Sequence, residues 1–269
     1  DDGEISSSDL DPGDFVSFVD GGGLGSFAAT HTYATGGIFT VTITVRDDDT
    51  GVVTTTTQAW VSGTRLAPDG TLQIVGTSND DHVSVNKQGN GILKVHADFL
   101  LDGPFETFNT ADVVKIIAYL CQGDDHLTIA GNIDIPSIVH ADSGDDYVHG
   151  GGGPTVLLGG PGVDMLVGGS GRDILIGGLG EDRLVGGNDG DVLIGGRTDE
   201  DDDDEALMFA LAAWTSSEGY AVRAAAVDAL LAVLDDEEFD LLTGSSGRDL
   251  FYDGLSDILN DLKATETVL

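Results

Sequence analysis

A nine-residue repeat between residues 141 and 194 restricts the fold of this chain more than any other feature of its sequence. In register, the six consecutive units read ADSGDDYVH, GGGGPTVLL, GGPGVDMLV, GGSGRDILI, GGLGEDRLV and GGNDGDVLI. The glycines permit sharp turns and close backbone approach, so a coil can turn twice in 18 residues. The pattern predicts a solenoid with two parallel sheets and an apolar interior. The predicted interior residues are Val148, Leu157, Leu166, Leu175, Leu184 and Leu193.

The sixth position of the repeat carries the chemistry, because it is an aspartate in every unit except one, where Thr155 replaces it. Stacked carboxylates would repel one another unless a cation lay between them. Carboxylate oxygens together with the backbone carbonyls of a tight turn form the all-oxygen environment that Ca²⁺ prefers. We therefore expect calcium to be the cofactor, and calcium removal to unfold the coils.

These units resemble the G-G-x-G-x-D-x-U-x calcium-binding repeat of the repeats-in-toxin (RTX) family. The resemblance implies a parallel β-roll in which calcium ions lie between turns of the same edge, so that ligands pair 18 residues apart. One edge then carries Asp146, Asp164 and Asp182. The other carries Thr155, Asp173 and Asp191, where Thr155 lacks the carboxylate that the pattern requires.

Degenerate copies of the repeat lie on both sides of the regular block, at 79–83, 123–127, 238–242 and 244–251. They supply four further predicted metal ligands, Asp81, Asp125, Asp240 and Asp249. Runs rich in Val, Ile and Leu at 72–76, 92–96, 113–120 and 137–139 are typical of strands. We expect residues 66–140 to form broader, degenerate coils with weaker or absent metal sites.

The amino-terminal residues have a different pattern, in which apolar residues alternate with Thr over 39–45, turn at 47–51 and resume as a strand. With His31-Thr32-Tyr33 and the run from Gly36, this hairpin resembles the polycystic-kidney-disease (PKD) type of immunoglobulin-like domain, which implies an extracellular spacer or adhesive module. About 63 residues fall short of the roughly 100 of such a sandwich. We expect strand addition from another copy, with residues 263–269 as donor; the alternative is replacement of the missing strands within the chain.

An acidic stretch at 199–205 leads into two Ala- and Leu-rich segments, 206–214 and 218–234, that predict a helical hairpin. A metal role for Asp199, Asp201 and Asp203 is open, although they lack the glycine and glutamate of an EF-hand loop. The hairpin is expected to cover the outward face of the sheet formed by alternate repeats, which is wholly apolar. That face consists of Val156, Leu158, Ile174, Ile176, Val192 and Ile194.

Composition excludes some functions. The 48 acidic residues against 11 basic ones give a formal charge of −37, which disfavours a nucleic-acid partner. No apolar run approaches the ~20 residues of a transmembrane segment. The chain has no His-Glu-x-x-His motif, and Gly168 to Arg172 fails the last position of G-x-S-x-G, so we assign no catalytic residues and expect no enzyme.

The sequence thus predicts a mainly β protein, a parallel β-solenoid with an Ig-like sandwich before it and a helical hairpin insertion near its C-terminus. The predicted divisions are 1–63 (PKD-like module), 66–140 (degenerate coils), 141–196 (calcium-binding repeats), 197–238 (acidic loop and hairpin) and 239–269 (final repeats and tail). The predicted function is that of a secreted calcium-binding structural or adhesive protein, a homo-oligomer or filament with a cell-surface or matrix ligand. The alternative is the non-catalytic carboxyl-terminal region of a larger secreted enzyme or toxin.

Overall fold

The computed structural model describes residues 33–46, 52–101, 103–252, 254 and 256–269. It also gives the backbone of three short strands, β1 (Glu4–Ile5), β2 (Phe15–Asp20) and β3 (Gly25–Thr30). The chain divides into two compact units, Asp1–Val61 and Ser62–Leu269, and each is described by itself.

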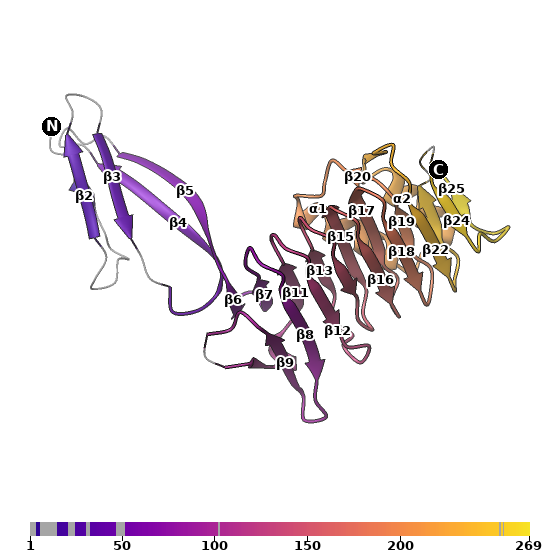
Figure 1. Cartoon of the computed structure of the whole chain (residues 1–269), viewed down its shortest axis with the longest axis horizontal. Coiled ribbons are helices and arrows are strands. Elements are labelled where there is room, and N and C mark those ends of the chain that lie inside the picture. The colour runs from indigo at the N-terminus through magenta and orange to yellow at the C-terminus, as the bar shows by residue number, and fades with distance from the viewer. Residues whose placement is uncertain are drawn as a thin grey trace. The chain divides into compact units, whose positions relative to one another are not determined.

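The first unit contains only antiparallel strand pairs. β4 (Gly37–Arg46) pairs along its whole length with β5 (Val52–Val61), β1 pairs with the far end of β4, and β2 pairs with β3 (Figure 1). The two long strands are those that the alternation of Thr with apolar residues predicts. The predicted turn at 47–51, and His31 and Thr32 of the PKD-like string, lie outside the described residues.

The second unit is built from two nine-stranded sheets. In spatial order, the first, here called the open sheet, contains β10 (Phe105–Asn109), β9 (Ile92–Ala97), β8 (His82–Lys87), β12 (His126–Ile129), β14 (Tyr147–His149), β16 (Met165–Gly169), β18 (Arg183–Gly187), β22 (Leu241–Ser245) and β24 (Ile258–Asn260). The second, here called the covered sheet, contains β25 (Thr267–Val268), β23 (Leu250–Tyr252), β19 (Val192–Ile194), β17 (Ile174–Leu179), β15 (Thr155–Pro161), β13 (Ser137–His140), β11 (Lys115–Tyr119), β7 (Thr71–Val75) and β6 (Gly63–Leu66).

The repeat sets the register of both sheets. Leu157 pairs with Leu175 in the covered sheet and Leu166 pairs with Leu184 in the open sheet, so each coil advances by 18 residues. The eighth-position side chains from the two sheets meet in one fully buried row. The predicted parallel solenoid and its interior are therefore confirmed.

The degenerate region 66–140 departs from prediction, because not all of its strands belong to parallel coils. β9 runs antiparallel to both β8 and β10, and β6 runs antiparallel to β7. A tight turn at Gly89-Asn90-Gly91, with φ of +78° at Gly91, reverses the chain after β8. The strand at 92–97 is thus a hairpin partner rather than the wall of a coil.

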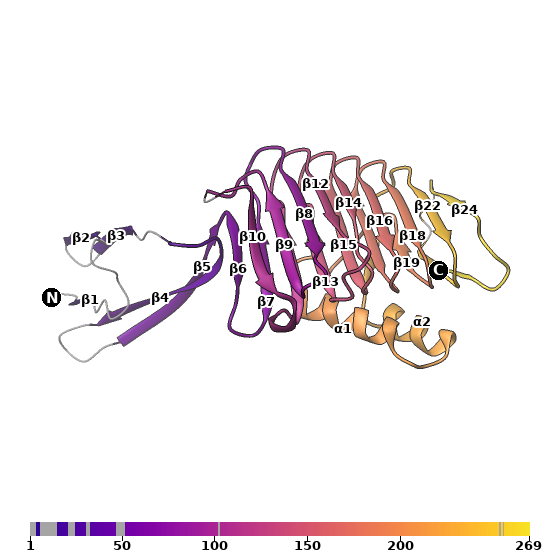
Figure 2. The same cartoon turned by 90° about the horizontal axis from the view of Figure 1, so that it is seen from below.

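Two helices lie along the outward face of the covered sheet (Figure 2). α1 (Asp204–Thr215) and α2 (Tyr220–Asp228) bury Leu207, Leu211 and Val227 against the apolar outward residues of that sheet, which confirms that the face is covered. Neither helix is long and apolar enough to cross a bilayer, a finding that concerns the described residues.

The helical segment differs from prediction at its end. The second helix stops at Asp228 instead of Leu234, and β21 (Val233–Leu234) pairs antiparallel with β20 (Arg197–Thr198). This pair closes the base of the insertion, so the chain can return to the solenoid. The remaining helix, η1 (Thr110–Asp112), is a single 3₁₀ turn.

The carboxyl-terminal tail also departs from prediction. Residues 267 and 268 form β25, which pairs in parallel with β23 of the same chain through Leu250–Thr267 and Phe251–Val268. The alternating, β-favouring character of the tail therefore serves the last coil of its own solenoid. It is not a free donor strand.

Trp214 offers a test of the helix–sheet packing. Its side chain is fully buried and its Nε1–H donates to the carbonyl oxygen of Gly190 at 2.7 Å. Trp214→Ala should lower the free energy of unfolding by about 3–5 kcal/mol, measured by urea denaturation in calcium, because a cavity and an unpaired carbonyl remain. Phe209→Ala, on the same helix but with 64% of the side chain exposed, is the control and should cost much less. Equal losses would show that α1 does not depend on this contact.

Candidate metal sites

The sixth-position aspartates form hydrogen-bonded ladders along the two edges of the solenoid. Oδ1 of Asp164 accepts the backbone N–H of Asp146 at 2.8 Å, and the N–H of Asp164 donates in turn to Oδ1 of Asp182 at 2.8 Å. The same bond repeats on both edges. The first edge contains Asp81, Asp125, Asp146, Asp164, Asp182, Asp240 and Asp257. The second edge contains Thr155, Asp173, Asp191 and Asp249.

The other oxygen of the carboxylate, Oδ2, is buried without a hydrogen-bond partner along most of both ladders. Among the described residues this holds for Asp125, Asp146, Asp164, Asp173, Asp182, Asp191, Asp240 and Asp249. A buried carboxylate oxygen with no donor is costly unless it binds a proton or a cation. The repetition of the same orphan atom at every step points to a repeated ligand.

Glycines keep the space beside each orphan oxygen open. A Cβ on Gly159 would lie 2.3 Å from Oδ2 of Asp164 and 2.4 Å from the carbonyl oxygen of Gly177, and one on Gly186 would lie 2.4 Å from Oδ2 of Asp191. Any larger residue would therefore fill this space. Side-chain and main-chain oxygens face it together.

These donors fit calcium. They are all oxygen, they combine carboxylates with carbonyls, and they lie on a flexible glycine turn, which suits a hard cation with variable coordination number. No three acidic, His or Cys side chains of the described residues converge as a metal cluster, so backbone carbonyls would complete the coordination. A bound ion would supply the positive charge that the facing carboxylates lack.

Burial is the main cause of the electrostatic state of the ladders. It raises the pKa of Asp164 to about 7, and the pKa values of Asp173 and Asp182 to about 8. The pKa of Asp191 rises to about 10, because the charges of Asp173 and Asp249 add to its burial. Without a cation these side chains therefore hold protons at neutral pH.

All nine aspartates predicted as ligands lie in the two ladders, but Asp81 differs from the others. Its Oδ2 accepts the N–H of Thr77 at 2.6 Å and its Oδ1 accepts the Thr77 hydroxyl at 2.9 Å. The carboxylate is therefore paired within its own turn, at the upstream end of the first edge. Thr155 ends the second edge, where its hydroxyl bonds to that of Ser137 at 3.0 Å.

Two ladder residues escaped the sequence analysis. The N–H of Asp240 donates to Oδ1 of Asp257 at 3.2 Å, and the last parallel strand pairs place Glu266 one step beyond Asp249. Both lie 17 residues after their partners instead of 18. A search that tolerated a one-residue deletion would have found them.

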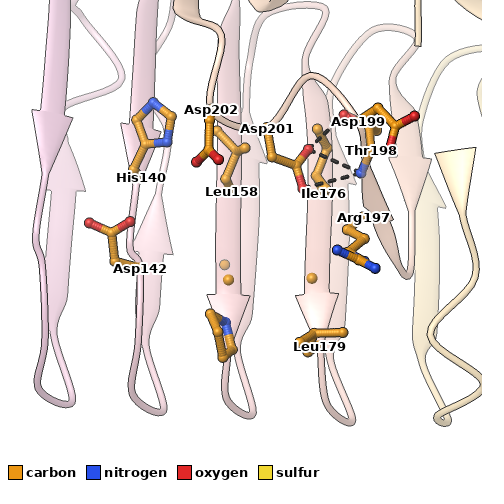
Figure 3. Close-up of a pocket in the computed structure, with 14 residues that line it drawn as sticks. His140, Asp142, Leu158, Ile176, Leu179, Arg197, Thr198, Asp199, Asp201 and Asp202 are labelled. Carbon is orange, nitrogen blue, oxygen red and sulfur yellow. Dashed lines mark hydrogen bonds between the residues drawn. The ribbon is translucent and has the colours of Figure 1, made fainter. Parts of the chain in front are cut away.

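A second polar group lines a cavity of about 350 Å³ between the covered sheet and residues 197–202 (Figure 3). Asp201, for which the sequence left a metal role open, accepts the N–H and hydroxyl of Thr198. Asp203 caps α1 by accepting the N–H groups of Glu205 and Ala206, each at 3.0 Å. These bonds assign both carboxylates structural roles in the acidic loop.

Comparison with known proteins identifies the repeats. Residues 137–157 and 158–196 match the RTX calcium-binding nonapeptide repeat, in four copies. Proteins with these repeats bind calcium and are typically secreted. The match spans well under half of the chain, so it characterises the repeats rather than the whole protein. No curated protein and no solved structure matches the chain significantly.

Replacement of Asp164 tests the ladder. Asp164→Asn keeps an oxygen for the N–H of Asp146 but removes the charge beside Gly159, so calcium affinity of the adjoining steps should fall by at least about tenfold. Calorimetric calcium titration measures the change. The control is Asp145→Asn, which removes the same charge from an exposed neighbour. Equal losses in the two variants would refute the assignment of the slots.

The raised pKa values predict how stability depends on pH without calcium. The folded state binds more protons than the unfolded state, whose aspartates titrate near ~3.9, so stability should fall as pH rises from about 4 to about 8. Thermal melts in calcium-depleted buffer with about 0.5 M salt, which screens surface repulsion, measure this. Excess calcium should abolish or reverse the slope, because only the ionised carboxylate binds the ion. A slope that is the same with and without calcium would contradict the prediction.

Proposed function

We propose that the chain is a secreted calcium-binding structural or adhesive protein that acts by binding and assembly and not by catalysis. The observation that carries the proposal is the row of buried carboxylate oxygens without partners along both edges. Such a row is unstable as a set of charges and stable as a set of cation ligands, so calcium outside the cell would hold the solenoid rigid.

The amino-terminal unit is proposed to be an immunoglobulin-like module of the PKD type, displayed by the solenoid. The antiparallel pairing of β4 with β5 and of β1 with β4 supports this proposal. β5 also exposes apolar side chains, with 54% of Val52 and 70% of Val53 accessible. An apolar strand face of this kind suits contact with a partner surface.

Self-assembly by strand addition is the second part of the proposal. Both large sheets are open, so β10 and β24 end the open sheet with unpaired backbone groups on one side. A head-to-tail contact between such edges continues from copy to copy and yields a filament. Because the tail is held in its own coil, the edges themselves are the proposed contact.

Edge-directed assembly predicts a specific effect of charge on β10. Thr107→Lys, on that exposed edge, should reduce calcium-dependent filaments because a lysine on an edge strand opposes the addition of another strand. Light scattering and electron microscopy in calcium measure the filaments. Thr128→Lys, on the central strand β12, makes the same change where no strand can be added, and should leave assembly intact. Wild-type protein that stays monomeric in calcium would refute the filament.

The alternative, a non-catalytic RTX region of a larger secreted enzyme or toxin, makes a different prediction about the native molecule. Mass spectrometry of the protein captured from the culture medium by an antibody to the repeats separates the two. A secreted species near 27.8 kDa supports the proposed structural protein. A much larger species with catalytic domains supports the alternative.

A further inference from the structure

The last step of the second edge differs chemically from the steps before it. β23 and β25 pair Leu250 with Thr267, so Glu266 stands one coil beyond Asp249, where the ladder would place an aspartate. The side chains of both residues are completely inaccessible to solvent. A buried pair of facing carboxylates thus closes this edge, as it would in an interior step.

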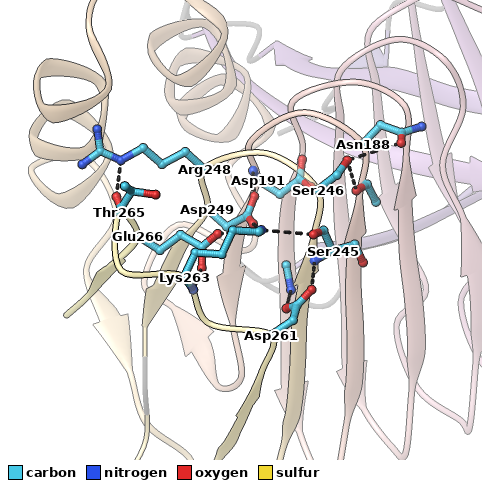
Figure 4. Close-up of polar contacts among 12 residues, drawn as sticks. Asn188, Asp191, Ser245, Ser246, Arg248, Asp249, Asp261, Lys263, Thr265 and Glu266 are labelled. Carbon is cyan, nitrogen blue, oxygen red and sulfur yellow. Dashed lines mark hydrogen bonds and ion pairs between the residues drawn. The ribbon is translucent and has the colours of Figure 1, made fainter.

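A lysine ammonium lies against this pair (Figure 4). Nζ of Lys263 is 2.9 Å from Oε1 of Glu266, 3.1 Å from the carbonyl oxygen of Ser245 and 3.7 Å from Oδ2 of Asp249. These three oxygens are of the same kinds that face the space in the interior steps, two carboxylates and a backbone carbonyl. Among the described residues, no other aspartate with an unpartnered Oδ2 lies within 4 Å of a lysine or arginine nitrogen.

The surrounding turn holds the ammonium in place. The N–H of Lys263 donates to Oε2 of Glu266 at 2.5 Å, and the N–H of Glu266 donates to the carbonyl of Lys263 at 3.0 Å. Asp261 accepts the N–H of Ser245 at 2.9 Å, and the Arg248 guanidinium donates to the Thr265 carbonyl. The turn from 261 to 266 is therefore fixed to the preceding coil by bonds of the protein alone.

We propose that the Lys263 ammonium is a built-in cation that occupies the last slot of the second edge, so that Asp249 and Glu266 bind no calcium. A glutamate suits this role better than an aspartate, because its extra methylene lets the carboxylate reach a lysine on its own turn. The final coil would then stay formed when calcium is removed. The inference rests on the proposed calcium binding of the interior steps.

The test compares Lys263→Met with wild type in two measurements. Met keeps the length of the side chain without its charge, so the variant should bind one more calcium ion per chain at saturation, counted by equilibrium dialysis. In calcium-depleted buffer, amides of residues 265–269 should exchange hydrogen at least about tenfold faster in the variant. Lys87→Met is the control, because Lys87 pairs at 4.0 Å with an exposed Asp134 at the other end of the solenoid. It should change neither result.

Equal calcium counts in wild type and Lys263→Met would overturn the proposal. A crystal structure of the wild type in calcium tests it without any variant: an anomalous peak between Asp249 and Glu266, with Lys263 turned to solvent, would also overturn it. Wild-type protein that binds no calcium at any step would refute the calcium function itself. In that case, faster exchange in Lys263→Met would still support the ammonium as the counter-ion of this pair.

Discussion

The half-paired carboxylate is the interaction on which the rest of this solenoid depends. One oxygen of each ladder aspartate accepts the backbone N–H of the residue one coil earlier, as in the 2.8 Å bond from Asp146 to Asp164. That bond fixes the register, while the second oxygen faces a space kept open by glycine. Register and cation binding therefore belong to the same side chain. A coil cannot form its ladder without creating a demand for a proton or a metal ion.

This coupling explains how the solenoid tolerates a large insertion. The N–H of Asp182 reaches Oδ1 of Asp240 at 2.8 Å across 58 residues, 40 more than the 18 of a regular step (58 − 18). The ladder bond is the same because the added residues leave and return at one point, where β20 pairs with β21. The insertion in turn supplies α1 and α2 to the one sheet whose outward side chains are apolar throughout. Stability thus comes from coil-to-coil contacts and from the cover, as in other repeat proteins.

A strict period made much of this predictable from sequence. The nine-residue spacing assigned interior, edge and outward positions one by one, so the buried leucines, the paired aspartates and the covered face all followed from it. The period failed where the same residue types serve a different turn. Glycine and asparagine at 89–91 make a hairpin that reverses β9, and no periodic pattern distinguishes that turn from the turns of a coil. The contact of Lys263 with Asp249 was also out of reach, because it depends on side-chain direction and on a 17-residue step.

The ends of the ladders raise a physical problem that the interior does not, since a terminal carboxylate has a neighbour on one side only. The upstream ends answer it with hydroxyl groups. Asp81 is paired with the amide and hydroxyl of Thr77, and Thr155 replaces the carboxylate by a hydroxyl bonded to Ser137. At the downstream end of the second edge, Lys263 meets the same need with a positive charge. In each case the unpaired charge is removed at the boundary, so that the demand for calcium is confined to the steps between.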